Sequence, residues 1–329
     1  MRTMNNIEYT FIVNELKQLI GKHFENAYCP SASKIRIKVS GIDIVCDPGK
    51  RLNIAKYVEE SVLSQFAKTL RKELENAKLH DVYQYNNDRV IVLDFLKNKT
   101  SFKIIFEMFA DGNIILTKTE EKNEKTIAAL KYEQWSDRQI KRNDDYRFPK
   151  SNIKNNVNDA ITSAGEKYII VALLQLPLGK EYALEILSRC KVEEKRKTSS
   201  LSANEVLKLE KEVEILQNEA KAFGFYENGK IIDFGLTKFS KYVELGTEIR
   251  EFQNLSEVVD EYYLTNKEQK NENIEKLKRR LEEQEKRLVE LKLQGKEKRD
   301  IAEYIYQNYE HIEKILNEKT KKKEIDIEV

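Results

Sequence analysis

Residues 265–329 carry apolar side chains at heptad spacing. One register contains Ile274, Leu281, Leu288, Gly295, Ala302, Tyr309 and Leu316, and the other contains Leu277, Gln284, Leu291, Lys298, Ile305 and Ile312. Ten of these thirteen residues are apolar, and the faces between them are charged, which is the pattern of a coiled-coil seam. The sequence therefore predicts a long C-terminal coiled-coil helix over 265–329, here called the C-terminal arm.

A helix of this length limits what the rest of the chain can do. About 50 helical residues span roughly 75 Å, because each residue adds ~1.5 Å. Such a helix cannot fold back on a globular domain along its whole length, so the seam needs a partner helix, from a second chain or another copy of this one. Gln284, Gly295 and Lys298 weaken the seam and can set its register. The printed sequence ends at 321–329 before any returning helix.

The first 150 residues read as an α+β domain with a mostly antiparallel sheet. Helical periodicity occurs at 7–22 and 55–76, and alternation of apolar and polar residues occurs at 35–39 and 42–46. Three further strands are predicted at 89–95, 102–109 and 113–118, with Asp111-Gly112 as the hairpin turn between the last two. The sequence therefore predicts that residues 1–150 form one domain, an antiparallel sheet with helices packed on it.

Two smaller segments follow. Residues 151–200 predict helices broken at Leu176-Pro177-Leu178-Gly179-Lys180, and Ser163 and Glu166 have capping-box spacing. A helix–glycine turn–helix of this kind can present the N–H groups around Gly179 and Lys180 to phosphate, although an ordinary two-helix packing unit has the same spacing. Residues 201–264 predict a helix capped by Ser202 and Glu205, a hairpin turning at 227–230, and a short helix capped by Ser256.

Composition excludes several classes of protein. The formal net charge is +2, so any basic surface must be local, and charged residues reach 35%. Cys29, Cys46 and Cys190 are far apart and odd in number, which favours reduced thiols in a cytoplasmic protein. No Cys/His cluster has zinc spacing, and no apolar run approaches the ~20 residues of a membrane span. No P-loop, G-x-G-x-x-G or G-x-S-x-G motif occurs, so we expect no metal, no cofactor and no enzymatic activity.

Asp88 and Arg89 open the strand at 89–95, which is otherwise largely apolar. Burying an unpaired carboxylate or guanidinium costs several kcal/mol, so we expect both groups at an accessible rim. They either form a solvated strand end or meet a partner. Lys68, Arg71 and Lys72 lie on one predicted helix and form either a solvated surface or a basic face for an RNA backbone.

A set of segments, in order along nearly the whole chain, resembles the NFACT family, which includes nuclear export mediator factors, RqcH-like ribosome-associated quality-control proteins and fibronectin-binding-type proteins. The matching segments are 15–17, 68–72, 88–93, 106–117, 178–187, 226–234, 259–263 and 301–308. The segment 106–117 resembles the family's strand–turn–strand signature, and 178–187 resembles its helix-hairpin-helix. This implies an N-terminal half: an NFACT-N-like domain, a helix-hairpin-helix and the first coil helix.

The resemblance implies a factor that binds a large ribosomal subunit holding stalled peptidyl-tRNA, recruits tRNA and promotes untemplated C-terminal tailing. Asp88 and Arg89 match the family's Asp-Arg pair for tRNA recruitment. Glu8 stands where the family usually has an Asp in the first helix, and its side chain is one methylene longer. The tip domain, returning helix and C-terminal RNA-binding domain of the family have no counterpart in the printed sequence. Expected partners are the large subunit, tRNA and a coiled-coil helix, with no membrane.

Two alternatives remain open. A coiled-coil scaffold or adhesin-type protein without RNA function would account for the heptads and the charge. The family's fold also resembles that of formamidopyrimidine-DNA glycosylases, but those enzymes use an N-terminal Pro beside a Glu. Here Arg2 and Thr3 occupy those positions, and the sequence has three scattered Cys instead of a four-Cys zinc finger.

Overall fold

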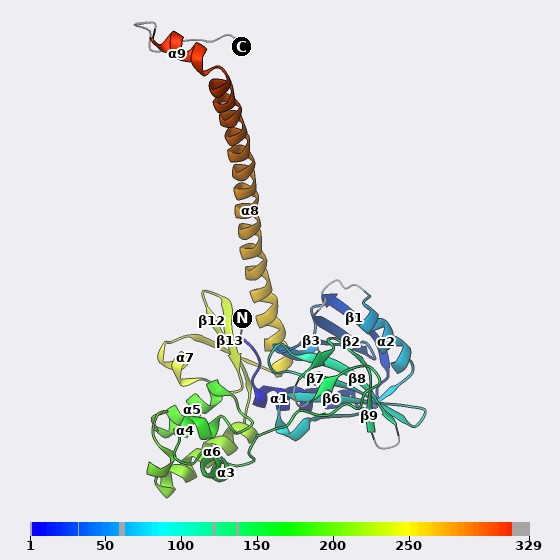
Figure 1. Ribbon diagram of the computed structural model, residues 1–329. Helices are drawn as coiled ribbons and strands as arrows, with labels where there is room; N and C mark the ends of the chain where they lie inside the picture. Colours follow the sequence, from blue (N-terminus) through cyan, green and yellow to red (C-terminus); the bar gives the residue numbers. More distant parts are fainter. Residues whose placement is uncertain (1, 32, 59–62, 121–122, 136–137, 318–329) are drawn as a thin grey trace. The chain divides into compact units, whose positions relative to one another are not determined.

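The computed structural model describes residues 2–31, 33–58, 63–120, 123–135 and 138–317, although side chains at several positions of the long C-terminal helix, including 267–276, lie outside the description. The chain divides into two compact units, Met1–Asn266 and Lys267–Val329. Within the first unit, helices α3–α6 gather on one side and the two larger sheets on the other (Figure 1).

The first sheet contains four antiparallel strands in sequence order: β1 (Phe24–Ser31), β2 (Lys34–Val39), β3 (Ile42–Asp47) and β4 (Arg51–Ala55). The predicted hairpin is confirmed as β2–β3, where Val39 pairs with Ile42. Ile35, Ile37 and Val39 are buried at alternate positions, as the period of two requires.

The second sheet contains five antiparallel strands in sequence order: β5 (Lys78–Gln84), β6 (Val90–Lys97), β7 (Thr100–Glu107), β8 (Asn113–Glu120) and β9 (Asn123–Ala129). The three predicted strands are confirmed as β6, β7 and β8. One face of this sheet joins the main core, and residues of the β10 (Glu133–Gln134) and β11 (Gln139–Ile140) hairpin and of 146–148 cover the other face.

Helix α1 (Asn6–Leu16) contacts strands of both sheets, β4 and β5. It begins with a capping box between Asn5 and Glu8 and continues as the short helix η1 (Lys17–Leu19). Ile7, Tyr9, Ile12 and Val13 are all buried, so α1 is packed on several sides rather than on a single stripe.

The predicted helix 55–76 begins too early, because residues 55–58 and 63–64 are not helical, while residues 59–62 lie outside the description. Ala55 ends β4, where it pairs with Asp43 of β3. Helix α2 is Gln65–Leu74, and it begins where the Ser64 side chain accepts from the Ala67 N–H. Val58, expected on the apolar face, is 42% exposed, and Val62 lies outside the described residues.

The middle segment forms α3 (Val157–Ala164), α4 (Ile169–Leu173), α5 (Lys180–Cys190), the short helix η3 (Thr198–Ser200) and α6 (Ala203–Asn218). The expected cap at Ser163 is wrong, because α3 starts at an Asn156 cap and ends at Gly165, after Ser163. The Ser202–Glu205 capping box is confirmed at the start of α6.

A third sheet, in the order β13–β12–β14, is built from β12 (Ala222–Glu227), β13 (Lys230–Gly235) and β14 (Glu248–Phe252), with α7 (Ser240–Glu244) between β13 and β14. The hairpin predicted at 227–230 is confirmed as the β12–β13 turn. Ser256 does not cap a separate short helix: the Asn254 side chain accepts from the Glu257 N–H at 2.9 Å, and the helix continues beyond Tyr263.

Helix α8 runs from Leu255 to Gln307 without interruption, and α9 (Tyr309–Asn317) follows it. Four leucines of the predicted seam are more than half exposed, namely Leu277, Leu281, Leu288 and Leu291. Residues 318–329 of the predicted arm, and the side chains of Ile274 and Leu316, lie outside the description. The structure therefore contains the long helix, and the pairing of this helix with a second helix stays a prediction.

The two larger sheets meet where two tight turns touch backbone to backbone. Gly49 lies in the β3–β4 turn at φ +72°, and Gly112 lies in the β7–β8 turn at φ +60°. A Cβ on Gly112 would overlap the backbone of Pro48 and Gly49, and a Cβ on Gly49 would overlap the Ala110 carbonyl oxygen. Both positions therefore require glycine for its conformation and for the space it leaves.

Replacing Gly112 with Ala should lower the free energy of unfolding by roughly 2–4 kcal/mol, because the backbone turns must separate as well as accept a strained φ. Gly41 is a matched control, since its φ is +84° and nothing lies within 4 Å of a Cβ there. G41A should cost only about 1 kcal/mol. Urea unfolding of both variants measures the difference, and equal losses would contradict the turn-to-turn contact.

Candidate nucleic-acid interface

The predicted Asp-Arg pair lies at the entrance to β6. The short helix η2 (Tyr85–Asn87) precedes it, and Asn86 and Asn87 have left-handed φ values of 49° and 53°. Asn tolerates this conformation better than most residues, which explains why two of them stand at the turn. Asp88 is half-buried and Arg89 is exposed, so solvent reaches both ionic groups.

Backbone hydrogen bonds fix the pair in place. The Arg89 carbonyl accepts from the Met108 N–H at 2.8 Å, and the Asp88 carbonyl accepts from the Val90 N–H at 2.8 Å. The Asp88 side chain accepts from the Arg89 N–H at 2.7 Å. Among the described residues, no salt bridge involves either side chain. The charges are therefore positioned by the backbone and remain free to meet a ligand, while their role stays a prediction.

Aromatic side chains surround this rim, which we define as residues 85–89. Tyr85 stacks on Phe148 with 3.9 Å between ring centroids, and Phe148 meets Tyr146 edge to face at 5.0 Å. Tyr9 of α1 is fully buried, and burial raises the pKa of its phenol well above the usual value. Aromatic packing therefore supports the rim at Tyr85.

A cluster that sequence reasoning missed is centred on Glu107, the residue before Met108. Glu107 holds Arg138 through two parallel 2.7 Å hydrogen bonds and accepts a third, also 2.7 Å, from the Tyr146 hydroxyl. Burial, followed by the Glu107 charge, raises the pKa of Tyr146 far above its usual value, so the phenol acts as a donor. The Arg138 guanidinium lies over the Trp135 ring at 4.7 Å. Trp135 is the single tryptophan of the chain, a signal that could have drawn attention to this segment.

Glu8 is in the interior, with its side chain fully buried. It pairs with Arg2, accepts from the Asn5 N–H at 2.5 Å and accepts from the Tyr182 hydroxyl at 2.6 Å. Arg2 also bonds Asp233 at 2.7 Å, and Asp233 accepts from Tyr242 at 2.7 Å. The structure therefore places Glu8 in an internal network, apart from the exposed Arg89, and gives its carboxylate a role in joining α1 to α5 and β13.

The predicted basic helix face is divided. Lys68 and Lys72 are exposed on α2, whereas Arg71 is half-buried and donates to the Ala27 carbonyl at 2.8 Å. Arg71 also lies over the Tyr28 ring at 4.7 Å. The two lysines are free to meet an RNA backbone, and Arg71 mainly fastens α2 to β1.

The glycine turn before α5 faces another part of the protein. Gly179 has φ +116°, and a Cβ there would overlap the Asn5 side chain. The adjacent Leu178 carbonyl accepts from the Ile7 N–H at 3.1 Å. The turn therefore seats the start of α5 against the start of α1, leaving Lys180 exposed for any phosphate contact.

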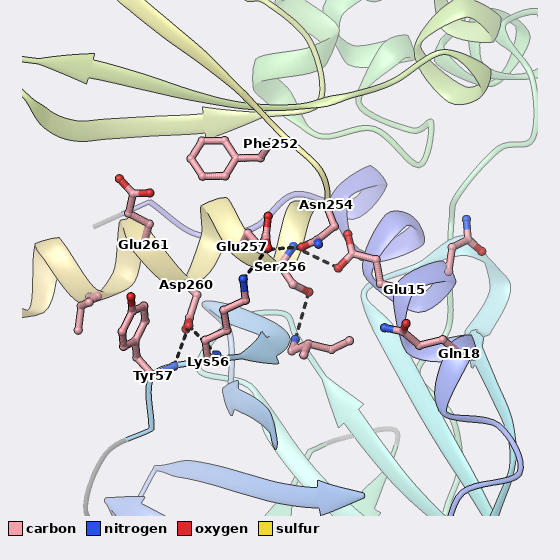
Figure 2. A pocket seen from close by; sticks show the side chains of 13 residues that line it. Glu15, Gln18, Lys56, Tyr57, Phe252, Asn254, Ser256, Glu257, Asp260 and Glu261 are labelled. Carbon is pink, nitrogen blue, oxygen red and sulfur yellow. Dashed lines mark hydrogen bonds and ion pairs between the residues drawn. The ribbon is translucent and has the colours of Figure 1, made fainter. Parts of the chain in front are cut away.

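A cavity of about 620 Å³ lies between α1, the end of β4 and the first turns of α8 (Figure 2). Glu15 caps α8 there, accepting from the Leu255 N–H at 2.6 Å and the Ser256 N–H at 3.1 Å. Glu257, Asp260 and Glu261 also line it, against the single cation Lys56, which bonds Glu257 at 2.6 Å. None of the predicted site residues lines this cavity, and its excess of carboxylates disfavours phosphate.

Within the described ranges, no group of three or more His, Cys, Asp or Glu side chains has a metal-binding arrangement. Among the described helices, none combines the length and apolar character needed to cross a bilayer.

The buried Glu8 network generates a test of what Glu8 does. E8A should lower the free energy of unfolding by about 3 kcal/mol or more, because it removes one of the two carboxylates that pair with buried Arg2 and leaves the Tyr182 hydroxyl and the Asn5 N–H without their acceptor. D88A is the matched control and should cost within about 0.5 kcal/mol, since Asp88 forms no ion pair. If E8A weakened RNA binding while leaving urea unfolding unchanged, a direct RNA contact would be favoured over this structural role.

Comparison with known proteins relates nearly the whole chain to one protein family. The family model described as NFACT N-terminal and middle domains matches residues 7–328. The archaeal Rqc2 homolog aRqcH of Methanocaldococcus jannaschii is 29% identical over 355 aligned positions, covering 95% of this chain and 51% of that protein. The ribosome quality control complex subunit NEMF homolog of Drosophila melanogaster is 26% identical over 116 positions, 33% of this chain and 12% of that protein. The chain thus spans about half the length of the archaeal relative.

Solved structures agree on the fold. The N-terminal part of the fibronectin/fibrinogen-binding protein from Streptococcus suis has a TM-score of 0.60 at 17% identity, covering 80% of this chain and 99% of that one. The fibrinogen binding protein from Staphylococcus aureus has a TM-score of 0.61 at 19% identity, covering 79% and 98%. With the family match over nearly its full length, the chain belongs to the NFACT family and carries that family's N-terminal and middle domains.

Proposed function

We propose that this chain is the tRNA-binding head of a ribosome-associated quality-control factor. The proposal is carried by one observation: Asp88 and Arg89, an acid and a base that form no ion pair with any described residue, are held by backbone hydrogen bonds at an accessible rim. Membership of the NFACT family and the relatives named for ribosome quality control support the same role.

In this proposal Arg89 contacts a phosphate or an exposed base, and Asp88 accepts from a ribose or base donor. The exposed Lys68 and Lys72 of α2 and Lys180 of α5 add contacts to RNA backbone. The chain would act in the cytoplasm on large subunits with stalled peptidyl-tRNA and recruit tRNA for C-terminal tailing. Peptidyl transfer would be the ribosome's chemistry, so we propose binding and positioning, without enzymatic activity, for this chain.

The C-terminal arm has a separate part in the proposal. Leu281, Leu288 and Leu291 present an exposed apolar seam, and a helix with such a seam gains free energy by pairing. We propose a partner helix from a second chain or another copy. The same seam supports the alternative of a scaffold without RNA function, and RNA binding separates the two.

The double variant D88A/R89A should weaken tRNA binding by at least about tenfold, because it removes a charge-assisted contact worth roughly 1–3 kcal/mol. Its unfolding free energy should stay within about 1 kcal/mol of the unchanged protein, since both sites are solvent-accessible. Fluorescence anisotropy of labelled tRNA measures the affinity, which should also fall steeply with salt.

The matched control is K118A/E120A, which removes an exposed ion pair of 2.9 Å and likewise leaves net charge unchanged. It should bind tRNA as the unchanged protein does. Equal affinity for D88A/R89A and this control would contradict the assignment of the rim. Absence of saturable tRNA binding by the unchanged protein would favour the scaffold.

The seam predicts concentration-dependent association of the arm. L281N/L288N should abolish it, because two apolar seam positions become polar. V289N is the control, since Val289 is equally exposed but lies outside the seam. Sedimentation equilibrium over a range of protein concentrations gives the association constant, and a chain that stays monomeric throughout would contradict self-pairing.

A further inference from the structure

The only tryptophan of the chain, Trp135, is exposed to solvent near the rim. Trp135 follows β10, is 41% exposed, and donates its backbone N–H to the Arg138 carbonyl at 2.9 Å. The Arg138 guanidinium lies 4.7 Å from its ring centroid and covers one face. A large aromatic ring with one face supported and substantial area exposed is the form of a stacking surface.

The support under the ring is rigid. Arg138 is 9% exposed and Glu107 is 2% exposed, and they are joined by two 2.7 Å hydrogen bonds. The Tyr146 hydroxyl completes the coordination of Glu107 at 2.7 Å. Because the guanidinium is already neutralised and fixed, a ligand that stacks on Trp135 pays little to order the platform. We call Trp135, Arg138 and Glu107 the Trp135 platform.

Two hollows share this platform. One has a cavity volume of about 520 Å³ and is lined by charged side chains of both signs, three basic (Lys125, Arg138, Arg147) and two acidic (Asp144, Asp145). The other, of about 340 Å³, is lined by Phe109, Pro149 and the β7–β8 turn. Both are lined by Trp135 and Arg138, so a planar group on the indole has space beside it for its attached sugar and phosphate.

The platform is connected directly to the rim. The Arg89 carbonyl accepts a hydrogen bond from the Met108 N–H. The two neighbours of Met108 in the sequence are Glu107, which belongs to the platform, and Phe109, which lines the smaller hollow. Val90 pairs with Glu107 in the β6–β7 register. The start of β6 and the end of β7 therefore bring the charged pair and Glu107, which anchors the platform, to the same end of the sheet.

We propose that the Trp135 platform stacks an unpaired base of the RNA that the rim holds. Unpaired bases are recognised by stacking on aromatic rings and guanidinium planes. Arg147 is exposed, lines the larger hollow and has no salt bridge among the described residues, so it suits the phosphate next to the stacked base. This inference rests on the proposed tRNA-binding function and assigns part of that site to residues outside the Asp-Arg pair.

The single tryptophan makes the test direct in the unchanged full chain. Deacylated tRNA is titrated while tryptophan emission is followed, with inorganic polyphosphate as a probe that has charge but no bases. Stacking predicts saturable quenching of Trp135 by tRNA and none by polyphosphate. Quenching by both probes alike would overturn the inference, because it would report charge or a conformational change instead of a base.

Variants then separate stacking from indirect effects, with labelled-tRNA anisotropy as the readout. W135L should weaken binding by about tenfold, the loss of one stacked base, and W135F should largely restore it. Y132L is the matched control, because Tyr132 is an exposed aromatic of the same segment that lines neither hollow.

Normal tRNA binding without quenching, together with unchanged affinity of W135L, would overturn the platform while leaving the rim's function standing. Weaker tRNA binding by D88A/R89A, with Trp135 quenching retained once tRNA is raised to saturation, would support both proposals. Absence of any tRNA binding by the unchanged chain would overturn both.

Discussion

A buried charge must be paired, and the first unit is organised around one such pair. Arg2 and Glu8 meet in the interior, where Arg2 also donates to Asp233 and Glu8 also accepts from Tyr182. Tyr242 donates in turn to Asp233. These groups come from the N-terminal segment, α1, α5, β13 and α7, so one network ties the sheets to the helical segment. Because removal of one member would leave buried charged or polar groups short of partners, the network specifies how these parts pack.

Close backbone contacts extend this constraint. The Asn5 side chain fills the space that a side chain at Gly179 would need, and Gly49 meets Gly112 across the two larger sheets. Glu15 caps the start of α8 from the side of α1. Helix α1 is therefore the common support: its first turn holds the helical segment, and its last turn holds the start of the long helix.

This rigid support explains how the rim can leave charges unpaired. Main-chain hydrogen bonds to the β6–β7 pair place Asp88 and Arg89, and the Asp88 side chain adds one bond, from the Arg89 N–H. Among the described residues, neither side chain is used in an ion pair. The neighbouring Glu107 and Arg138 show the opposite solution, a buried pair that satisfies itself and supports an exposed ring. Together they give one end of a sheet both free charge and open aromatic surface, which are the two requirements for holding unpaired RNA.

The sequence by itself determined the features that depend on neighbours along the chain. Alternation predicted β2–β3 and β6–β8, capping residues predicted α6, and the heptads predicted the long helix. Only the tertiary structure decided the rest. Strand β4 forms because β3 pairs with it, and Glu8 is internal because Tyr182, 174 positions away, closes over it. The platform depends on Glu107 meeting Arg138, 31 positions away. Periodicity is a local property, whereas burial and ion pairing are set by residues that only folding brings together.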